Sequence, residues 1–184
     1  GFKIFMTGAP AGRDDEFEGL CLPEVPELYQ AMKLVAETGL VCAVHAENNQ
    51  LLEWHTAQLQ AAGRNDIPSH GESRPPHVEA LAVATLFSLN KTAGMNLHIA
   101  HLSSKETLEV FRMFKQAGAK GTAETCPHYL FFTEADLERV GPYAKINPPL
   151  RMQADVDALW EGIHDGVLMA VTTDHSPFTV EEKE

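Results

Sequence analysis

The sequence has few cysteines, no long apolar run and few basic side chains. Cys21, Cys42 and Cys126 form an odd, unpatterned set, which argues against a disulfide framework and favours a reducing compartment such as the cytoplasm. No apolar stretch approaches the roughly 20 residues of a membrane span, and no charged-then-apolar leader precedes the first apolar run. The net charge of -12 disfavours a nucleic-acid partner. We therefore expect neither membrane nor nucleic acid among the partners.

Short apolar runs alternate with helical patterns along all 184 residues, of which 44% are hydrophobic. The runs predict strands at about 1–6, 40–44, 95–100, 120–126 and 167–173. Amphipathic stretches predict helices at about 24–37, 49–62, 76–93, 104–117 and 153–163. Gly39, Gly63 and Gly94 stand at helix ends, and Ser103 or Ser104 is the expected N-cap of the fourth helix. This alternation predicts an α/β fold with about five parallel strands, buried on both faces.

Four side chains of metal-ligand type lie at or next to the C-terminal ends of these runs: Lys3, His45, His101 and Asp174. In a parallel α/β barrel, catalytic groups sit at this end of several different strands. Imidazole and carboxylate groups are ligands for zinc and similar divalent ions. A single histidine beside a strand is usually structural, but the ordered set predicts a metal-dependent hydrolase.

Five strand–helix units are too few for a closed TIM-type barrel, which takes eight units and roughly 250 residues. We therefore interpret residues 1–184 as the C-terminal part of a catalytic barrel. The first strands and the final segment of that barrel are expected to lie outside this sequence.

Six motifs occur in a characteristic order: GFKIFM, VHAEN, HLSS, ETCPHYL, INPPLR and TTDHSP. In this order they resemble the cyclic-amidohydrolase branch of the amidohydrolase superfamily, which contains allantoinases, dihydropyrimidinases (hydantoinases) and dihydroorotases. The motifs span nearly the whole chain, and the spacing of the four candidate ligands is close to that of allantoinases. The resemblance implies hydrolytic opening of a cyclic amide.

The resemblance also implies a role for each ligand. Lys3 would be carboxylated by carbon dioxide and would bridge two divalent metal ions, expected to be zinc. His45 and His101 would bind one ion, and Asp174 the other. Asp174 would also accept a proton from the water that bridges the two ions and pass it to the leaving ring nitrogen. The family's His-x-His pair does not occur in the 184 residues, so the chain by itself is expected to be inactive.

Substrate contacts are expected from three further motif residues, Asn147, His128 and His175. Asn147 matches the dihydroorotase form of its motif, whereas the SRPP, ETCPHYL and DHSP segments look more like allantoinases. Hydantoinases carry a tyrosine five residues after the bridging lysine, where this chain has Gly8. Allantoinase is therefore the first interpretation and dihydroorotase the second, with a small cyclic amide or ureide as substrate.

The main alternative belongs to a different class, because some superfamily members have lost metal ligands and serve as oligomeric scaffolds. Retention of all four candidate ligands argues against this alternative. Association into a homo-oligomer is expected under either interpretation. His98 is the poorer metal ligand beside His101, since residues three apart on a strand tend to face opposite sides. The remaining histidines are predicted to lie at the surface: His55, His70, His77 and His164.

Overall fold

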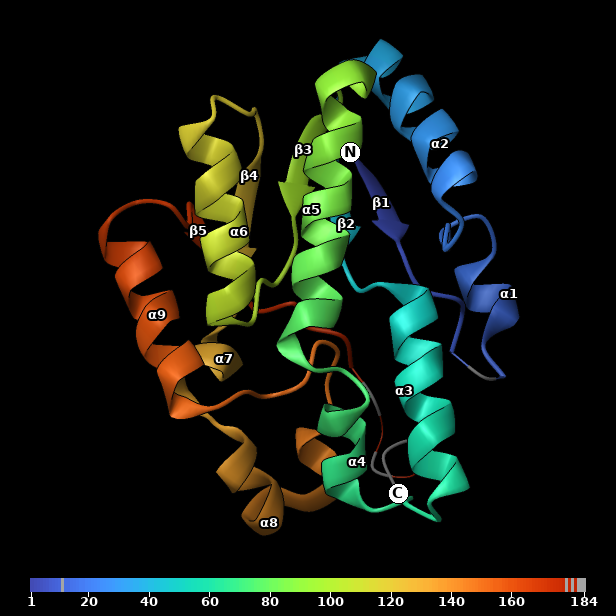
Figure 1. Ribbon diagram of the computed structural model, residues 1–184, viewed down its shortest axis with the longest axis vertical. Coiled ribbons are helices and arrows are strands. Elements are labelled where there is room, and N and C mark those ends of the chain that lie inside the picture. The colour runs from blue at the N-terminus through green and yellow to red at the C-terminus, as the bar shows by residue number, and fades with distance from the viewer. Residues whose placement is uncertain (11, 178, 180, 182–184) are drawn as a thin grey trace.

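The computed structural model describes residues 1–10, 12–177, 179 and 181 of the chain. Strands and helices alternate, as the sequence predicts (Figure 1). The strands are β1 (Phe2–Phe5), β2 (Val41–His45), β3 (Asn96–Ile99), β4 (Thr122–Thr125) and β5 (Ala170–Val171). The helices are α1 (Asp14–Phe17), α2 (Val25–Thr38), α3 (Asn49–Ala61), α4 (Ile67–Glu72), α5 (Pro76–Ala93), α6 (Lys105–Gln116), α7 (Pro127–Phe131), α8 (Leu137–Val140) and α9 (Gln153–His164). Two 3₁₀ turns complete the set, η1 (Glu134–Asp136) and η2 (Gly141–Ala144).

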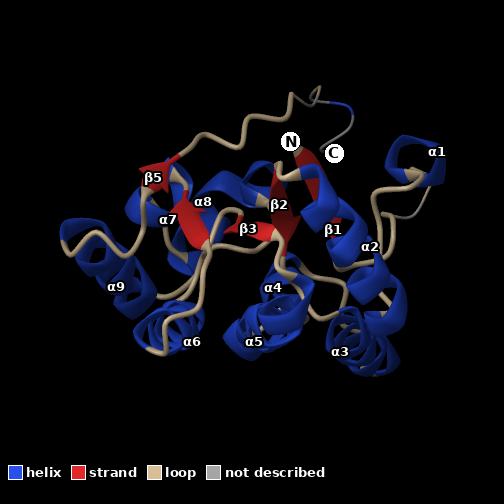
Figure 2. Cartoon of the chain, turned by 90° about the horizontal axis from the view of Figure 1, so that it is seen from above, coloured by secondary structure: helices blue, strands red, loops and turns tan. Residues whose placement is uncertain are grey.

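The five strands form one parallel sheet in the order β1-β2-β3-β4-β5. Figure 2 shows the sheet curved into an arc, with α5, α6 and α9 along its outer side. The segment that follows β5 runs along the opposite, concave side (Figure 2). The predicted α/β class, with parallel strands alternating with helices, is confirmed.

The strand register decides which side chains face the helices. Ile4, Val44 and Ile99 are paired across the sheet and are buried among the helices. Because successive strand residues point to opposite faces, their neighbours Lys3 and His98 point to the concave side. The concave face therefore carries charged and polar groups, and the helix-covered face carries the core.

Local signals explain the helix boundaries. Gly39 and Gly94 adopt left-handed conformations at the ends of α2 and α5, where a Cβ would be strained. The Ser104 side chain accepts a hydrogen bond from the Thr107 N–H and caps α6. Two features differ from the sequence prediction: α4 forms between the helices predicted over 49–62 and 76–93, and β5 is only two residues long where a strand was predicted over 167–173.

A single apolar layer joins the helices to the sheet. In α6 the buried residues Leu108, Phe111 and Phe114 lie on one face, at helical spacing. The Phe87 ring of α5 lies 5.5 Å from that of Phe111 and 5.2 Å from that of Phe114. Among the described residues, no helix is both long enough and apolar enough to cross a membrane.

Candidate active site

The centre of the candidate site is a pair of histidines from neighbouring strands. His45 ends β2, and His101 follows the end of β3 by two residues. Both are buried, and Nδ1 of His45 lies 3.1 Å from Nε2 of His101. Two nitrogen ligands of a tetrahedral zinc ion, each bonded at about 2.0–2.1 Å, lie roughly 3.4 Å apart. The two rings therefore need to separate only slightly to hold one divalent cation.

Glu47 orients the His45 ring. Its Oε2 lies 2.8 Å from Nε2 of His45, and a carboxylate can only accept a hydrogen bond, so Nε2 carries the proton. Burial raises the pKa of Glu47, but the hydrogen bond from His45 and the positive charge of Arg74 outweigh it and leave that pKa lowered. The Nδ1 lone pair of His45 consequently faces His101, as in metal sites where a carboxylate holds the outer nitrogen of a histidine ligand.

His101 reaches the same position through an unusual backbone conformation. Its φ of 40° lies in the left-handed region, and the only other described non-glycine residue with positive φ is Asp174, at 45°. Such conformations cost about 1–3 kcal/mol and cluster at functional sites. Burial lowers the pKa of His101 well below its usual value, and the neighbouring His45 and Lys3 groups lower it further. The ring is therefore neutral and keeps a lone pair for a ligand.

Lys3 lies on the concave face of β1, within electrostatic range of this pair. Burial lowers the pKa of its amine, while the Asp174 and Glu124 carboxylates act in the opposite direction. A lowered pKa increases the fraction of neutral amine, the form that can react with carbon dioxide. Asp174, although exposed, lies close enough to Lys3 and His128 to affect the pKa of both.

The structure thus brings the predicted ligands together in two halves, a His45–His101 pair and a Lys3–Asp174 pair. No cluster of three or more His, Cys, Asp or Glu side chains with metal-binding geometry occurs within the described parts of the chain. The donor types fit a divalent cation at the histidine pair, with Lys3 beside it.

His98 does not face away from the site as expected. β3 ends at Ile99 and the chain turns at His101, so the alternation of a regular strand does not extend between the two histidines. His98 lies on the concave face, with Nε2 3.0 Å from Glu124 Oε2 and Nδ1 2.7 Å from Thr122 Oγ1. Both of its ring nitrogens already have partners. His98 therefore remains the poorer metal ligand, but because of these contacts and not because it faces the opposite side of the sheet.

The three predicted substrate-contacting residues differ in their surroundings. His128 is half-buried with its ring 4.2 Å from that of Tyr129; burial lowers its pKa, and Asp174 opposes the shift. Asn147 is exposed in the loop before α9, and a cis peptide bond joins it to Pro148. His175 is exposed and follows Asp174. None of these placements by itself tests substrate contact.

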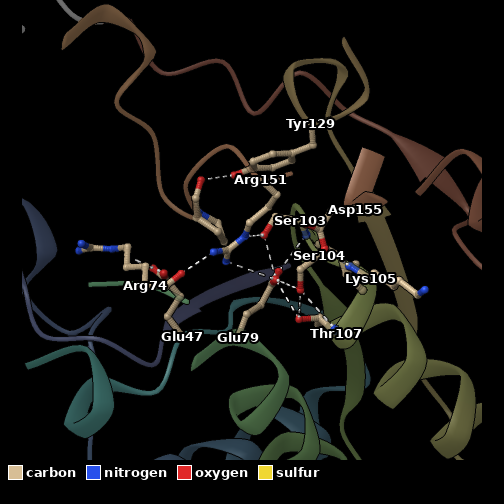
Figure 3. A network of polar contacts seen from close by, with 12 residues as sticks. Glu47, Arg74, Glu79, Ser103, Ser104, Lys105, Thr107, Tyr129, Arg151 and Asp155 are labelled. Atoms are coloured by element: carbon tan, nitrogen blue, oxygen red, sulfur yellow. Dashed lines mark hydrogen bonds and ion pairs between the residues drawn. The ribbon is translucent and has the colours of Figure 1, made fainter. Parts of the chain in front are cut away.

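The sequence analysis did not identify a buried polar network that includes Glu47, the partner of His45 (Figure 3). The Glu79 carboxylate accepts hydrogen bonds from the Ser103 N–H and from the hydroxyls of Ser103, Ser104 and Thr107. Arg151 donates to Ser103 Oγ and to the Arg74 carbonyl, and one of its nitrogens lies 3.9 Å from Glu79. Two features of the sequence could have indicated this network: Glu79, a charged residue among the apolar residues of α5, and Arg151 in the INPPLR motif.

His70 is not a surface residue, contrary to the sequence-based expectation. It lies in α4, and its Nε2 donates to the Ile146 carbonyl at 2.9 Å. Burial, followed by the charge of Arg74, lowers the pKa of His70 to about 4. The expectation failed because the partner of His70 is 76 residues away in the sequence.

The depressed His70 pKa predicts a pH-dependent stability. Between pH 6.5 and about 4 the unfolded state binds a proton that folded His70 does not, so the free energy of unfolding decreases as pH falls through this window. His70 alone is expected to lower the free energy of unfolding by about 3 kcal/mol across this pH window. Urea titrations of the wild-type and His70→Gln forms of a longer polypeptide containing this sequence measure it. Equal slopes of stability against pH in the two proteins would contradict the assignment.

Comparison with known proteins identifies the family. No protein-family model matches the chain. An allantoinase of Rubrobacter xylanophilus is 38% identical over 179 residues, which cover 96% of this chain and 38% of the relative. A dihydroorotase of Bacillus licheniformis is 36% identical over 182 residues, covering 97% of this chain and 40% of the relative. The solved L-hydantoinase (dihydropyrimidinase) of Arthrobacter aurescens superposes with a TM-score of 0.89 at 31% identity, covering 100% of this chain and 39% of that one.

The chain belongs to the cyclic amidohydrolase family. The family resemblance predicted from the six motifs is therefore confirmed, and the arc of five strands is part of the TIM-type barrel of its structural relatives. The chain spans about two-fifths of the length of the curated relatives that it matches. The names allantoinase, dihydroorotase and hydantoinase all describe hydrolases of cyclic amides.

Proposed function

We propose that the longer polypeptide containing this sequence is a metal-dependent hydrolase that opens a cyclic amide, with an allantoin-type ureide as the first candidate substrate. The observation that supports this proposal most directly is the position of two buried histidines at the C-terminal ends of adjacent parallel strands. His45 Nδ1 lies 3.1 Å from His101 Nε2. Lys3 is close enough to His101 to affect its pKa, and Asp174 is close enough to Lys3 to do the same. All four groups therefore lie in one region. Catalytic groups of barrel enzymes occupy this position.

The proposed metal ligands are those of the sequence analysis. His45 and His101 hold one divalent ion, expected to be zinc, and Asp174 and carboxylated Lys3 complete a two-ion site together with residues outside this chain. A bound divalent ion supplies Lewis-acid chemistry, polarising the amide carbonyl and lowering the pKa of water. Carboxylation of Lys3 converts its amine to a carbamate anion and releases one proton.

Asp174 is the proposed proton carrier. It is exposed on the segment after β5, which runs along the concave side of the sheet (Figure 2). Its carboxylate accepts the proton of the attacking water and donates it to the ring nitrogen when the C–N bond breaks. His128, His175 and Asn147 are proposed to contact the substrate. The closeness of His128 to Asp174 supports this role for His128.

The choice of substrate depends on two opposing observations. Several relatives carry the name allantoinase, which supports an allantoin-type ring. Asn147 in the INPPLR motif, together with the dihydroorotase relatives, supports dihydroorotate as the second candidate. Gly8 in place of the hydantoinase tyrosine disfavours a dihydropyrimidine substrate.

A side-by-side assay of allantoin, dihydroorotate and dihydrouracil tests the proposal. The zinc-loaded longer polypeptide is expected to hydrolyse allantoin with the highest kcat/KM. Faster turnover of dihydroorotate would assign the second candidate. Turnover of none of the three by protein of verified metal content would contradict the enzymatic proposal and favour the non-catalytic scaffold.

Three accompanying features are also proposed. Residues 1–184 form the C-terminal part of the catalytic barrel, the protein assembles as a homo-oligomer, and it acts in the cytoplasm. The first is supported by the coverage of the relatives, of which this chain spans only a part. The cytoplasmic location is supported by the unpatterned cysteine set.

A further inference from the structure

The loop that carries Asn147 is held on both sides by groups from other elements, a half-buried histidine and a buried tyrosine. Nε2 of His70 donates to the Ile146 carbonyl at 2.9 Å, immediately before Asn147. The Tyr129 hydroxyl donates to the Pro148 carbonyl at 2.6 Å, immediately after it. The backbone on each side of the exposed Asn147 side chain is therefore anchored through a carbonyl group.

The His70 anchor continues toward the histidine pair. Nδ1 of His70 lies 3.4 Å from Nη1 of Arg74, and Nε of Arg74 lies 3.5 Å from Oε1 of Glu47. The other Glu47 oxygen accepts the hydrogen bond from Nε2 of His45. Figure 3 shows Arg74 and Glu47 next to each other at one end of the buried network. An unbroken series of contacts thus runs from the Ile146 carbonyl through His70, Arg74 and Glu47 to His45.

Donor and acceptor chemistry gives each contact one direction. A carbonyl only accepts, so Nε2 of His70 carries its proton and Nδ1 presents a lone pair to the guanidinium, which only donates. Arg74 forms an ion pair with the Glu47 carboxylate, whose side chain is 1% exposed, and Arg151 also acts on this carboxylate electrostatically. A buried carboxylate without its cation would be strongly destabilised. A change at His70 or Arg74 would therefore alter the surroundings of Glu47, the carboxylate that accepts the hydrogen bond from His45.

We propose that His70, Arg74 and Glu47 are positioning residues that couple the Asn147 loop to the His45 ring, so that substrate contact and metal binding depend on each other. This inference rests on the proposed function, because it takes Asn147 as a substrate contact and His45 as a metal ligand. Coupling through such networks requires an energetic test rather than contiguity alone.

The test measures zinc affinity, by competition with a chelating dye, and the KM and kcat of the longer polypeptide. Glu47→Gln is expected to weaken zinc binding roughly 10–100-fold, as loss of the carboxylate partner of a histidine ligand does. His70→Leu, which touches no proposed ligand, is expected to raise KM and to weaken zinc binding roughly 2–30-fold. His70→Gln is expected to restore both values, since its amide N–H can donate to the Ile146 carbonyl.

The matched control is His164→Leu, at an exposed histidine in α9, and it should leave zinc affinity and KM unchanged. The double variant Glu47→Gln/His70→Leu should bind zinc as Glu47→Gln alone does, because the series of contacts is already interrupted. Fully additive losses would overturn the proposal. So would unchanged zinc affinity in a folded His70→Leu protein.

Two provisions keep the outcome decisive. If His70→Leu does not fold, Arg74→Lys replaces it. This variant keeps the positive charge but lacks the guanidinium that contacts both His70 and Glu47. Unchanged zinc affinity in Arg74→Lys would overturn the proposal. Zinc affinity is measured without substrate, so inactivity toward all three ring amides would contradict the proposed function while leaving the coupling test valid. Normal turnover of a ring amide, together with unchanged zinc affinity in His70→Leu or fully additive losses in the double variant, would overturn the coupling and leave the proposed function intact.

Discussion

Replacing Lys3 with alanine in the longer polypeptide is expected to lower turnover by orders of magnitude. Loss of a partner outside the metal's own ligands already costs roughly 10–100-fold in affinity or activity, so loss of a bridging ligand should cost more. Lys3 lies on the concave face, where burial lowers its pKa and Asp174 and Glu124 provide the nearby negative charges. Acetate or propionate should partly restore turnover, since a small carboxylate can occupy the position of the carbamate.

The matched control is Lys120→Ala, at an exposed lysine just before β4, which should leave turnover unchanged. Steady-state kinetics and metal analysis of the same preparations separate loss of metal from loss of chemistry. Full activity of the Lys3→Ala protein would show that the lysine is not a bridging ligand. A loss that no carboxylic acid restores would argue against the carboxylated form.

Changing Asp174 to asparagine is expected to reduce kcat by about 10²–10⁴-fold, the usual contribution of a positioned proton carrier. Asparagine keeps the shape of the side chain and one oxygen ligand, but it cannot accept and deliver a proton. Its amide tolerates the left-handed backbone at this position, where φ is 45°, so the fold should be preserved. Metal content should therefore decrease far less than kcat.

Asp157→Asn provides the control, because Asp157 is exposed on α9 and its carboxylate accepts a hydrogen bond from the Gln153 side chain of the same helix. The kcat should decrease in Asp174→Asn and keep its wild-type value in the control. Wild-type turnover in Asp174→Asn would refute the proton-transfer role. An equal loss of metal and activity would assign Asp174 a purely ligating role.

Much of the fold followed from local signals. The helix predicted over residues 76–93 matches α5 (Pro76–Ala93), because prolines suit a first helical turn and Gly94 adopts the left-handed conformation that ends it. The amphipathic stretches also predicted α2, α6 and α9 to within one residue at each end. These boundaries depend on interactions between residues a few positions apart, which a sequence displays directly.

The site was only partly predictable. The position of each candidate ligand near a strand end follows from the apolar runs, and parallel strands bring these ends to one edge of the sheet. The return of His101 toward His45 required a left-handed residue after β3, which no periodicity reports. The pairing of His98 with Glu124 required the register of β3 against β4, a contact between distant segments.

By itself, the sequence determined the α/β class, the order of the elements, the family and the four side chains proposed to bind metal. These conclusions rest on short-range periodicity, capping and ordered motifs. Only the tertiary structure decided that half-buried His70 donates to the Ile146 carbonyl, that Glu47 orients His45, and that Glu79 and Arg151 lie in one buried network. Each of these depends on burial and on partners from separate elements, because the cost of an unpaired buried polar group is set by its three-dimensional surroundings.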